Sequence, residues 1–336
     1  MNGRDPLQLP VAGVLAGIAV AAWFGADYFG MELLAEVAIL AIFAMSLDLL
    51  VGAAGMVSLG HAGFLALGAY ATAAATVLWG WPPLAAVGLS VAAAAAIAVG
   101  VGFFAVRLTG VFFIMITLAI GQMVHAYFVK ARVLGGDNGM AGTPRFDLAP
   151  LGLDSGDPAV FAACVLIAAL LVYLALLILR RSPFGMMLTA IHQNPGRLSS
   201  LGCPVRRYKL AAFGAAGAVA GLAGALMAQH TGFVSPDLAF WTLSGEALII
   251  VILGGSGSLI GAAGGAALYI LLRNQLNDGA FWKSLSLPPE MADHWQLIMG
   301  LFFIAVVLLA RDGLYGRLTW AIRHAALAVV RRRSRA

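Results

Sequence analysis

The sequence predicts an all-α polytopic membrane protein with about ten membrane helices, including short segments broken by glycine. Of its 336 residues, 62% are hydrophobic and only 10% are charged, whereas a soluble domain carries roughly a quarter charged residues. The apolar runs are long enough to be helical spans and too continuous to be barrel strands. This composition excludes a soluble enzyme and a disordered chain. In lipid, the runs must form helices, because only then are the backbone hydrogen-bonding groups satisfied within each run.

The apolar runs and their breakers give the order of the spans within one transmembrane domain, residues 1–336. The first run is immediately followed by another, which favours a true span over a cleavable signal. A glycine-rich stretch, Gly254–Ser258, divides one long run into two short half-helices, which either cross twice or form a re-entrant pair. We expect spans at 10–30, 32–51, 60–80, 82–106, 112–130, 158–179, 209–228, 243–273 (two segments) and 295–310.

The basic residues predict the orientation of the chain. The net charge is +5, and Lys and Arg gather in the loop 180–209 and in a basic tail, 311–336. Cytoplasmic flanks of membrane helices carry such an excess, which explains the charge without nucleic acid. With ten membrane segments, both termini are expected in the cytoplasm.

Two carboxylates, Asp48 and Glu246, lie inside or at the edge of apolar runs. An acidic side chain at a helix centre costs roughly 2.5–3.5 kcal/mol on insertion scales, so such groups usually face a bundle interior or a cavity. Both are therefore expected in a pathway or a structural polar cluster. Alternatively, Asp48 lies near a cytoplasmic helix end and merely caps the helix or meets water.

A second glycine-rich break, residues 52–63, contains Ser58 and His61, whose spacing places them on one side of a helix. No other ligand-type residue accompanies His61, so a hydrogen-bonded structural histidine is favoured over a metal ligand, and we expect no metal or cofactor. The pairs Gly217/Gly221 and Gly261/Gly265 have the spacing of close helix packing.

The loop 180–209 has internal structure. Ser182 and Pro183 can begin a helix, which Asn194 would end. An apolar stripe along it, made of Phe184, Leu188 and Ile191, is typical of a helix that docks in a groove of a partner protein. The alternative is an interfacial helix on lipid headgroups. The chain has no GxxxxGK[ST] motif, so ATP, if used, binds to another polypeptide.

Several motifs occur in a specific order and spacing. They lie at Leu47–Gly52, Ser58–Tyr70, Thr117–Gln122, Gly135–Gly139, Ser182–Asn194, Leu201–Gly202, Tyr208–Phe213, Gly232–Pro236, Ser244–Glu246 and Leu253–Ser258. In these motifs the chain resembles the permease subunits of ABC importers for branched-chain amino acids and their urea and amide relatives, over residues 41–316. It departs from them at His192, where arginine is more usual, and at Asp48, where asparagine is common.

The resemblance implies a fold similar to type II ABC importer permeases in a bacterial inner membrane. It implies a second homologous permease, two cytoplasmic ATP-binding subunits that hydrolyse the ATP, and a periplasmic or lipid-anchored substrate-binding protein. This chain would be no enzyme. The cargo would be branched-chain or related amino acids; urea, amides and organic acids are the alternatives within the family. A stand-alone ion- or proton-coupled secondary transporter is the alternative outside it.

Two sets of site residues follow from the carboxylates and the motifs together. The residues expected along the translocation pathway are Asp48, Ser58, His61, Tyr70, Thr117, Gln122 and Glu246. The residues that the resemblance assigns to ATPase coupling are Phe184, Gly185, Leu188, Ala190, Ile191, Asn194, Leu201 and Gly202.

Overall fold

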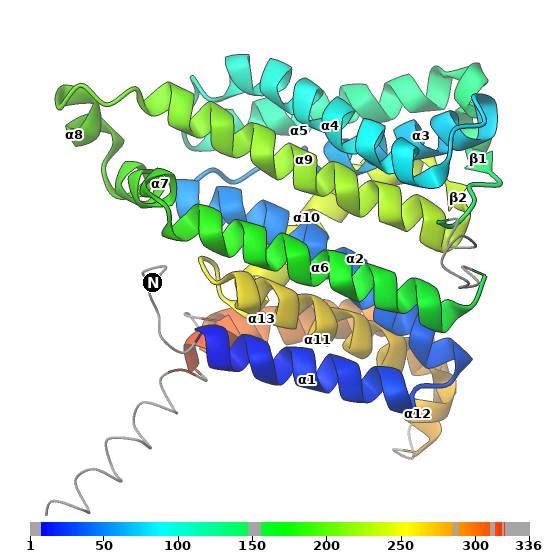
Figure 1. The fold of residues 1–336 in the computed structure, drawn as a ribbon. Coiled ribbons are helices and arrows are strands. Elements are labelled where there is room, and N and C mark those ends of the chain that lie inside the picture. Colours follow the sequence, from blue (N-terminus) through cyan, green and yellow to red (C-terminus); the bar gives the residue numbers. More distant parts are fainter. Residues whose placement is uncertain (1–7, 147–155, 285–287, 310–312, 318, 320–336) are drawn as a thin grey trace, which may run out of the picture.

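The computed structural model describes residues 8–146, 156–284, 288–309, 313–317 and 319. Most of the predicted basic tail, 311–336, and both chain ends lie outside the described residues. The described chain is a bundle of long helices (Figure 1).

Six helical stretches of the described chain are long and apolar enough to cross a membrane. Two of them continue an α-helix into a π-helix, and four are single α-helices. They are α2 (Tyr28–Asp48) with η1 (Leu49–Ala54), α3 (His61–Ala73) with η2 (Ala74–Leu78), α4 (Pro83–Ala105), α5 (Val111–Lys130), α6 (Pro158–Arg181) and α9 (Val205–Thr231). Each coincides with a predicted span.

The remaining apolar helices are shorter or bent. Helices α10 (Trp241–Gly254) and α11 (Leu259–Asn277) are bent by 115° at the predicted glycine break, and count as a seventh span if taken together. In the described part of the chain the first helix is α1 (Gln8–Gly25) and the last long one is α13 (Trp295–Leu309), and they coincide with the first and last predicted spans.

Short elements distinguish the two ends of the bundle. At one end lie α7 (Pro183–Gln193) and α8 (Pro195–Ser200), and at the other an antiparallel pair of two-residue strands, β1 (Met140–Ala141) and β2 (Phe233–Val234) (Figure 1). The other short elements are η3 (Arg132–Leu134), η4 (Gly136–Asn138), η6 (Pro236–Ala239), α12 (Gly279–Ser284) and η7 (Pro289–His294).

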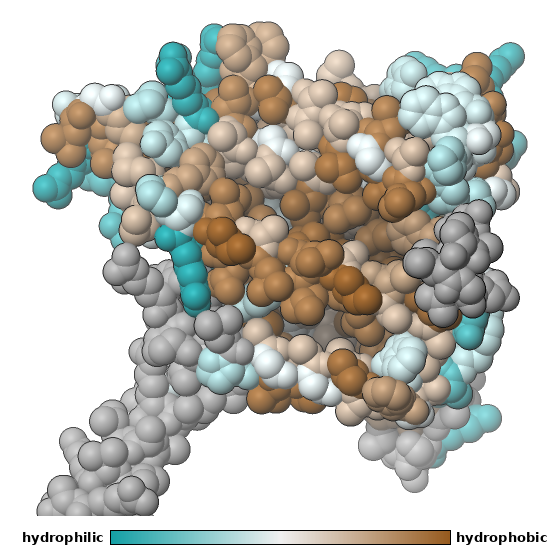
Figure 2. Space-filling model, viewed as in Figure 1, coloured by the Kyte–Doolittle hydropathy of each residue, from teal (hydrophilic) through white to brown (hydrophobic). Residues whose placement is uncertain are grey.

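Small residues let the helices approach closely, as the glycine spacings predict. A Cβ atom at Gly217 or Gly221 would meet α4, and one at Gly261 or Gly265 would meet the backbone of α10. The packing role of both pairs is therefore confirmed. The face of the bundle seen in Figure 2 is apolar across the middle and polar towards the ends carrying α7–α8 and β1–β2, as a lipid-embedded band requires.

Candidate functional site

The first break separates α2 from α3. Helix α2 continues into η1, and the chain then runs without helical structure from Gly55 to Gly60 before α3 begins at His61. Gly55 has a φ of +67°, which favours glycine. Ser58 and His61 are fully buried, so this irregular backbone faces protein, as membrane-embedded structure requires.

The second break separates α10 from α11. Gly255 and Gly257 have φ values of +108° and +86°, and the hydroxyl of Ser258 accepts a hydrogen bond of 3.1 Å from the Gly261 N–H at the start of α11. A serine cap therefore begins α11 after a turn that favours glycine.

The two breaks touch each other. A Cβ atom at Gly52 would collide with the backbone of Gly257. The Gly257 N–H donates to Asp48 Oδ1 at 2.7 Å, and the Ala62 N–H at the start of α3 donates to Ser244 Oγ on α10 at 2.8 Å. Two segments about 200 residues apart in sequence therefore form one junction.

Asp48 also joins this junction to α6. It is fully buried, and its Oδ2 accepts a hydrogen bond of 3.0 Å from Arg180, whose side chain is 10% exposed. The burial contradicts the alternative in which Asp48 meets water. Its carboxylate is instead the centre of a polar cluster that ties α2, α6 and the second break together.

Of the other predicted residues near the first break, His61 and Thr117 hold it in place. His61 Nε2 lies 2.8 Å from Ser46 Oγ and its ring stacks on Phe43, as expected of a structural histidine. Thr117 Oγ1 on α5 accepts a hydrogen bond of 3.3 Å from the Leu59 N–H. Gln122 follows Gly121, which packs against Gly60.

Tyr70 and Glu246 make different contacts. Tyr70 stacks on Phe128 at 3.9 Å, in a cluster with both short strands. Glu246 is half-buried, and its carboxylate accepts a hydrogen bond from the Tyr269 hydroxyl with Arg273 nearby. The structure thus gathers Asp48, Ser58, His61 and Thr117, and leaves these two side chains outside the junction.

Helix α7 packs on the bundle, with its apolar stripe turned inward. Leu188 and Ile191 are 0% and 1% exposed, and Phe184 is half-buried and stacks on Tyr208. The prediction that this stripe docks onto a partner is therefore wrong for Leu188 and Ile191, because the bundle itself already covers them. The exposed face of α7–α8 is the other one, and it includes Asn194 and Leu201.

The end of α7 contacts the first break, and its start packs on Arg180, which pairs with Asp48 on α2. At its start, a side chain at Gly185 would collide with the backbone of Arg180, the residue that holds Asp48. At its end, a Cβ atom at Gly55 would meet the imidazole ring of His192. A rigid movement of α7 would therefore act directly on the break.

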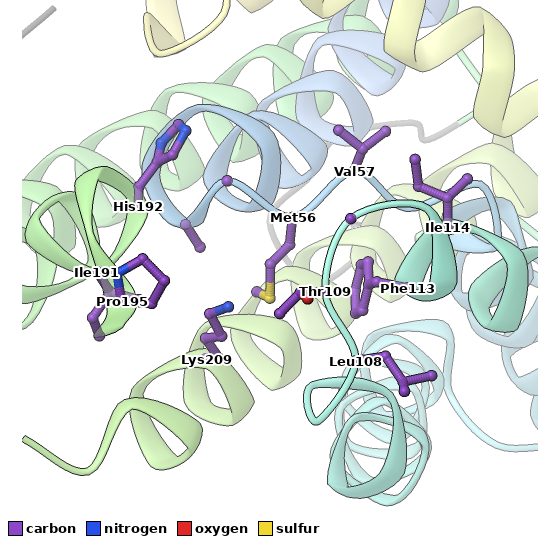
Figure 3. Close-up of a pocket in the computed structure, with 13 residues that line it drawn as sticks. Met56, Val57, Leu108, Thr109, Phe113, Ile114, Ile191, His192, Pro195 and Lys209 are labelled. Carbon is purple, nitrogen blue, oxygen red and sulfur yellow. The ribbon is translucent and has the colours of Figure 1, made fainter. Parts of the chain in front are cut away.

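A cavity of about 190 Å³ lies between α7, the first break and the α4–α5 loop (Figure 3). Apolar and polar groups share its walls, the polar side chains coming from the loop and from α7 and α9. The lining residues are Ala54, Gly55, Met56, Val57, Leu108, Thr109, Gly110, Phe113, Ile114, Ile191, His192, Pro195 and Lys209.

Comparison with known proteins identifies the family. Residues 30–307 match the family described as the permease component of branched-chain amino acid transport systems. The chain belongs to this family. No solved structure matches this permease.

Relatives of this permease carry the same description. It is 33% identical over 264 residues to the high-affinity branched-chain amino acid transport system permease protein LivM of Escherichia coli K12, and this match covers 70% of the chain but 61% of the relative. It is 32% identical over 305 residues to LivM of Salmonella typhimurium LT2, covering 83% of the chain and 71% of the relative. A probable LivM of Methanocaldococcus jannaschii is 26% identical over 163 residues.

Two residues of the permease site escape the sequence reasoning. Arg180 is interpreted from the sequence only as a basic residue that flanks a span. Ser46, the partner of His61, has no feature in the sequence that distinguishes it from other residues of its helix. The signal for Arg180 exists, because a carboxylate inside an apolar run needs a partner and Arg180 ends another apolar run. Ser46 carries no comparable signal.

A second set of ion pairs, away from the junction, is also not predicted from the sequence. Glu32 on α2 pairs with Arg145 at 2.8 Å, and Glu36 pairs with Arg273 on α11. These pairs tie α2 to the segment after β1 and to the end of α11.

Proposed function

We propose that this chain is a membrane-spanning subunit of an ABC importer that carries branched-chain amino acids across a bacterial inner membrane. Membership of the permease family and the names of the relatives support the substrate class. The proposed complex contains a second homologous permease, two cytoplasmic ATPases that supply the energy, and an extracytoplasmic substrate-binding protein.

One observation supports the mechanism: the end of α7 contacts Gly55 of the first break through His192, and its start packs on Arg180, the partner of Asp48. In the proposed cycle, ATP binding moves the ATPases and shifts α7. The shift reaches η1 through the Asp48–Arg180 pair and through the contact of His192 with Gly55. The two breaks then change their packing, and the pathway opens to one side or the other.

The ATPase binds, in this proposal, to the exposed face of α7–α8. Leu201, which follows α8, is 75% exposed although it is apolar, and Asn194 caps α8 through the Arg197 N–H at 3.0 Å. An exposed apolar side chain next to the end of a helix is a suitable anchor for a groove. Phe184, Leu188 and Ile191 position this surface from beneath.

Replacing this anchor is expected to separate coupling from folding. Leu201→Ala is expected to weaken retention of the ATPase by about 30-fold, because truncating an interface anchor commonly costs about 2 kcal/mol. Co-purification of the ATPase from solubilised membranes measures this. Val133→Ala, at an equally exposed residue (79%) of the other end, is the control and should retain the ATPase. Normal retention by Leu201→Ala would contradict this docking surface.

The proposed topology has ten membrane segments: the six full spans, the α10–α11 pair as two, and α1 and α13. It places α7–α8 and both termini in the cytoplasm. In a background without Cys164 and Cys203, we expect an impermeant thiol reagent to label Asp137→Cys in intact spheroplasts, and Ser199→Cys only after permeabilisation. The opposite pattern would invert the topology.

Uptake by the reconstituted complex tests the function. Proteoliposomes that hold both permeases and the ATPases, with ATP at the ATPase side, should accumulate radiolabelled leucine when the binding protein is added. An ATPase variant unable to hydrolyse ATP should abolish uptake. If the chain alone accumulated leucine on an ion gradient, the secondary-transporter alternative would replace this proposal.

A further inference from the structure

Lys209 is a largely buried residue whose ammonium group faces a cavity and has no counter-ion among the residues that the structure describes. It lies in the first turns of α9 and is 9% exposed. Within the described parts of the chain, no hydrogen bond or ion pair to its ammonium group occurs, and Figure 3 shows the side chain directed into the 190 Å³ cavity. An anion that enters the cavity would therefore meet an unpaired positive charge.

The surroundings of Lys209 favour a small anion with an apolar body. Apolar side chains, among them Met56, Phe113, Ile114 and Ile191, form one part of the wall beside polar groups, and none of the lining residues is acidic. The volume is below the roughly 300–1,000 Å³ of pockets for drug-sized ligands, so the cavity suits a compact solute.

A larger basic cleft adjoins the cavity. It measures about 580 Å³, shares Lys209 with the cavity, and is lined by Arg107, Arg206 and Arg207 without any acidic residue. Clefts lined by charge of one sign concentrate counter-ions, so this cleft favours the approach of anions.

We propose that the cavity is a release-side binding site for a branched aliphatic carboxylate, in which Lys209 binds the carboxylate and the apolar wall receives the side chain. The inference rests on the proposed function, which supplies a solute of this chemistry. The site lies between the first break and α7, so movement of α7 would change its walls and release the solute. Because the lining offers no counter-charge for an ammonium group, the amino group contributes little to binding.

Equilibrium binding to the purified permease–ATPase complex, without nucleotide and without binding protein, tests this site. The probes are L-leucine, 4-methylpentanoate, which lacks the amino group, and 3-methylbutylamine, which lacks the carboxylate. We expect the wild type to bind the two carboxylates and not the amine. Lys209→Met should weaken both by about ten- to a hundredfold, the worth of a hydrogen bond to a charged group.

Matched variants locate the effect. Lys130→Met, at an exposed lysine at the end of α5, should bind like the wild type. Lys209→Arg, which keeps the charge, should retain measurable binding. Val57→Phe should remove binding by filling the cavity. If Lys209→Met fails to assemble, the Val57→Phe variant tests the same site.

Three results would overturn the proposal: unchanged binding by Lys209→Met, loss of binding in Arg206→Met but not in Lys209→Met, or competition by inorganic phosphate as strong as that by 4-methylpentanoate. A wild-type complex that imports leucine but binds no 4-methylpentanoate would refute this site and leave the proposed function standing. Absence of ATP-dependent leucine uptake by the wild type would instead refute the proposed function.

Discussion

Arg180→Met is expected to destabilise the permease by about 3–5 kcal/mol, because it leaves the carboxylate of Asp48 buried without its ion-pair partner. Asp48 is 0% exposed and would retain only the Gly257 N–H as a hydrogen-bond donor. Since Arg180 also supports the start of α7, uptake should fall further than the amount of folded protein does. Thermal unfolding of the purified complex and uptake per assembled complex measure the two effects.

Neighbouring variants separate the ion pair from general loss of positive charge. Arg181→Met removes an exposed charge one residue later and should leave stability and uptake close to wild type. The double variant Asp48→Asn/Arg180→Met should recover part of the lost stability, because it buries no uncompensated charge and an amide oxygen can still accept from Gly257. Equal stability of Arg180→Met and wild type would show that the pair does not hold the junction.

Gly52→Ala is expected to lower uptake at least tenfold while the protein still inserts. The new methyl group would collide with the backbone of Gly257, so the two breaks would have to move apart. Overpacking of this kind commonly costs about 1–3 kcal/mol, and the displacement would also lengthen the hydrogen bond between Gly257 and Asp48. Uptake per assembled complex is the measurement.

Gly100→Ala is the control for this glycine. It lies on α4 with no atom near enough to meet an added Cβ, and should leave uptake unchanged. Wild-type uptake by Gly52→Ala would mean that contact between the two breaks is dispensable for transport.

Both variants act on one junction, and this explains why we expect large effects from small changes. The junction joins α2, α3, α6, α10 and α11 through Asp48, Ser244 and the Gly52–Gly257 contact. The protein interior is packed too closely to absorb a shift at one of these helices without repacking the others.

The sequence by itself determined the elements of this permease. Long apolar runs are expected in the membrane, and there they must be helical, because lipid offers the backbone no hydrogen bonds. Clusters of glycine or proline with polar residues break those runs, whereas single glycines such as Gly217 and Gly221 remain helical. The spans, both breaks and the helix after Ser182 could therefore be predicted from local composition. The burial of Asp48 could be anticipated for the same reason, since a carboxylate in an apolar run has few other solutions.

Only the tertiary structure decided which of these elements meet. The pairing of Asp48 with Arg180 joins residues 132 positions apart, and its contact with Gly257 spans 209 positions; no local pattern encodes such partners. The apolar stripe of α7 illustrates the same limit, because periodicity shows that a helix has an apolar face and cannot show what covers it. Leu188 and Ile191 pack on their own bundle, and the surface left free for a partner is the opposite one.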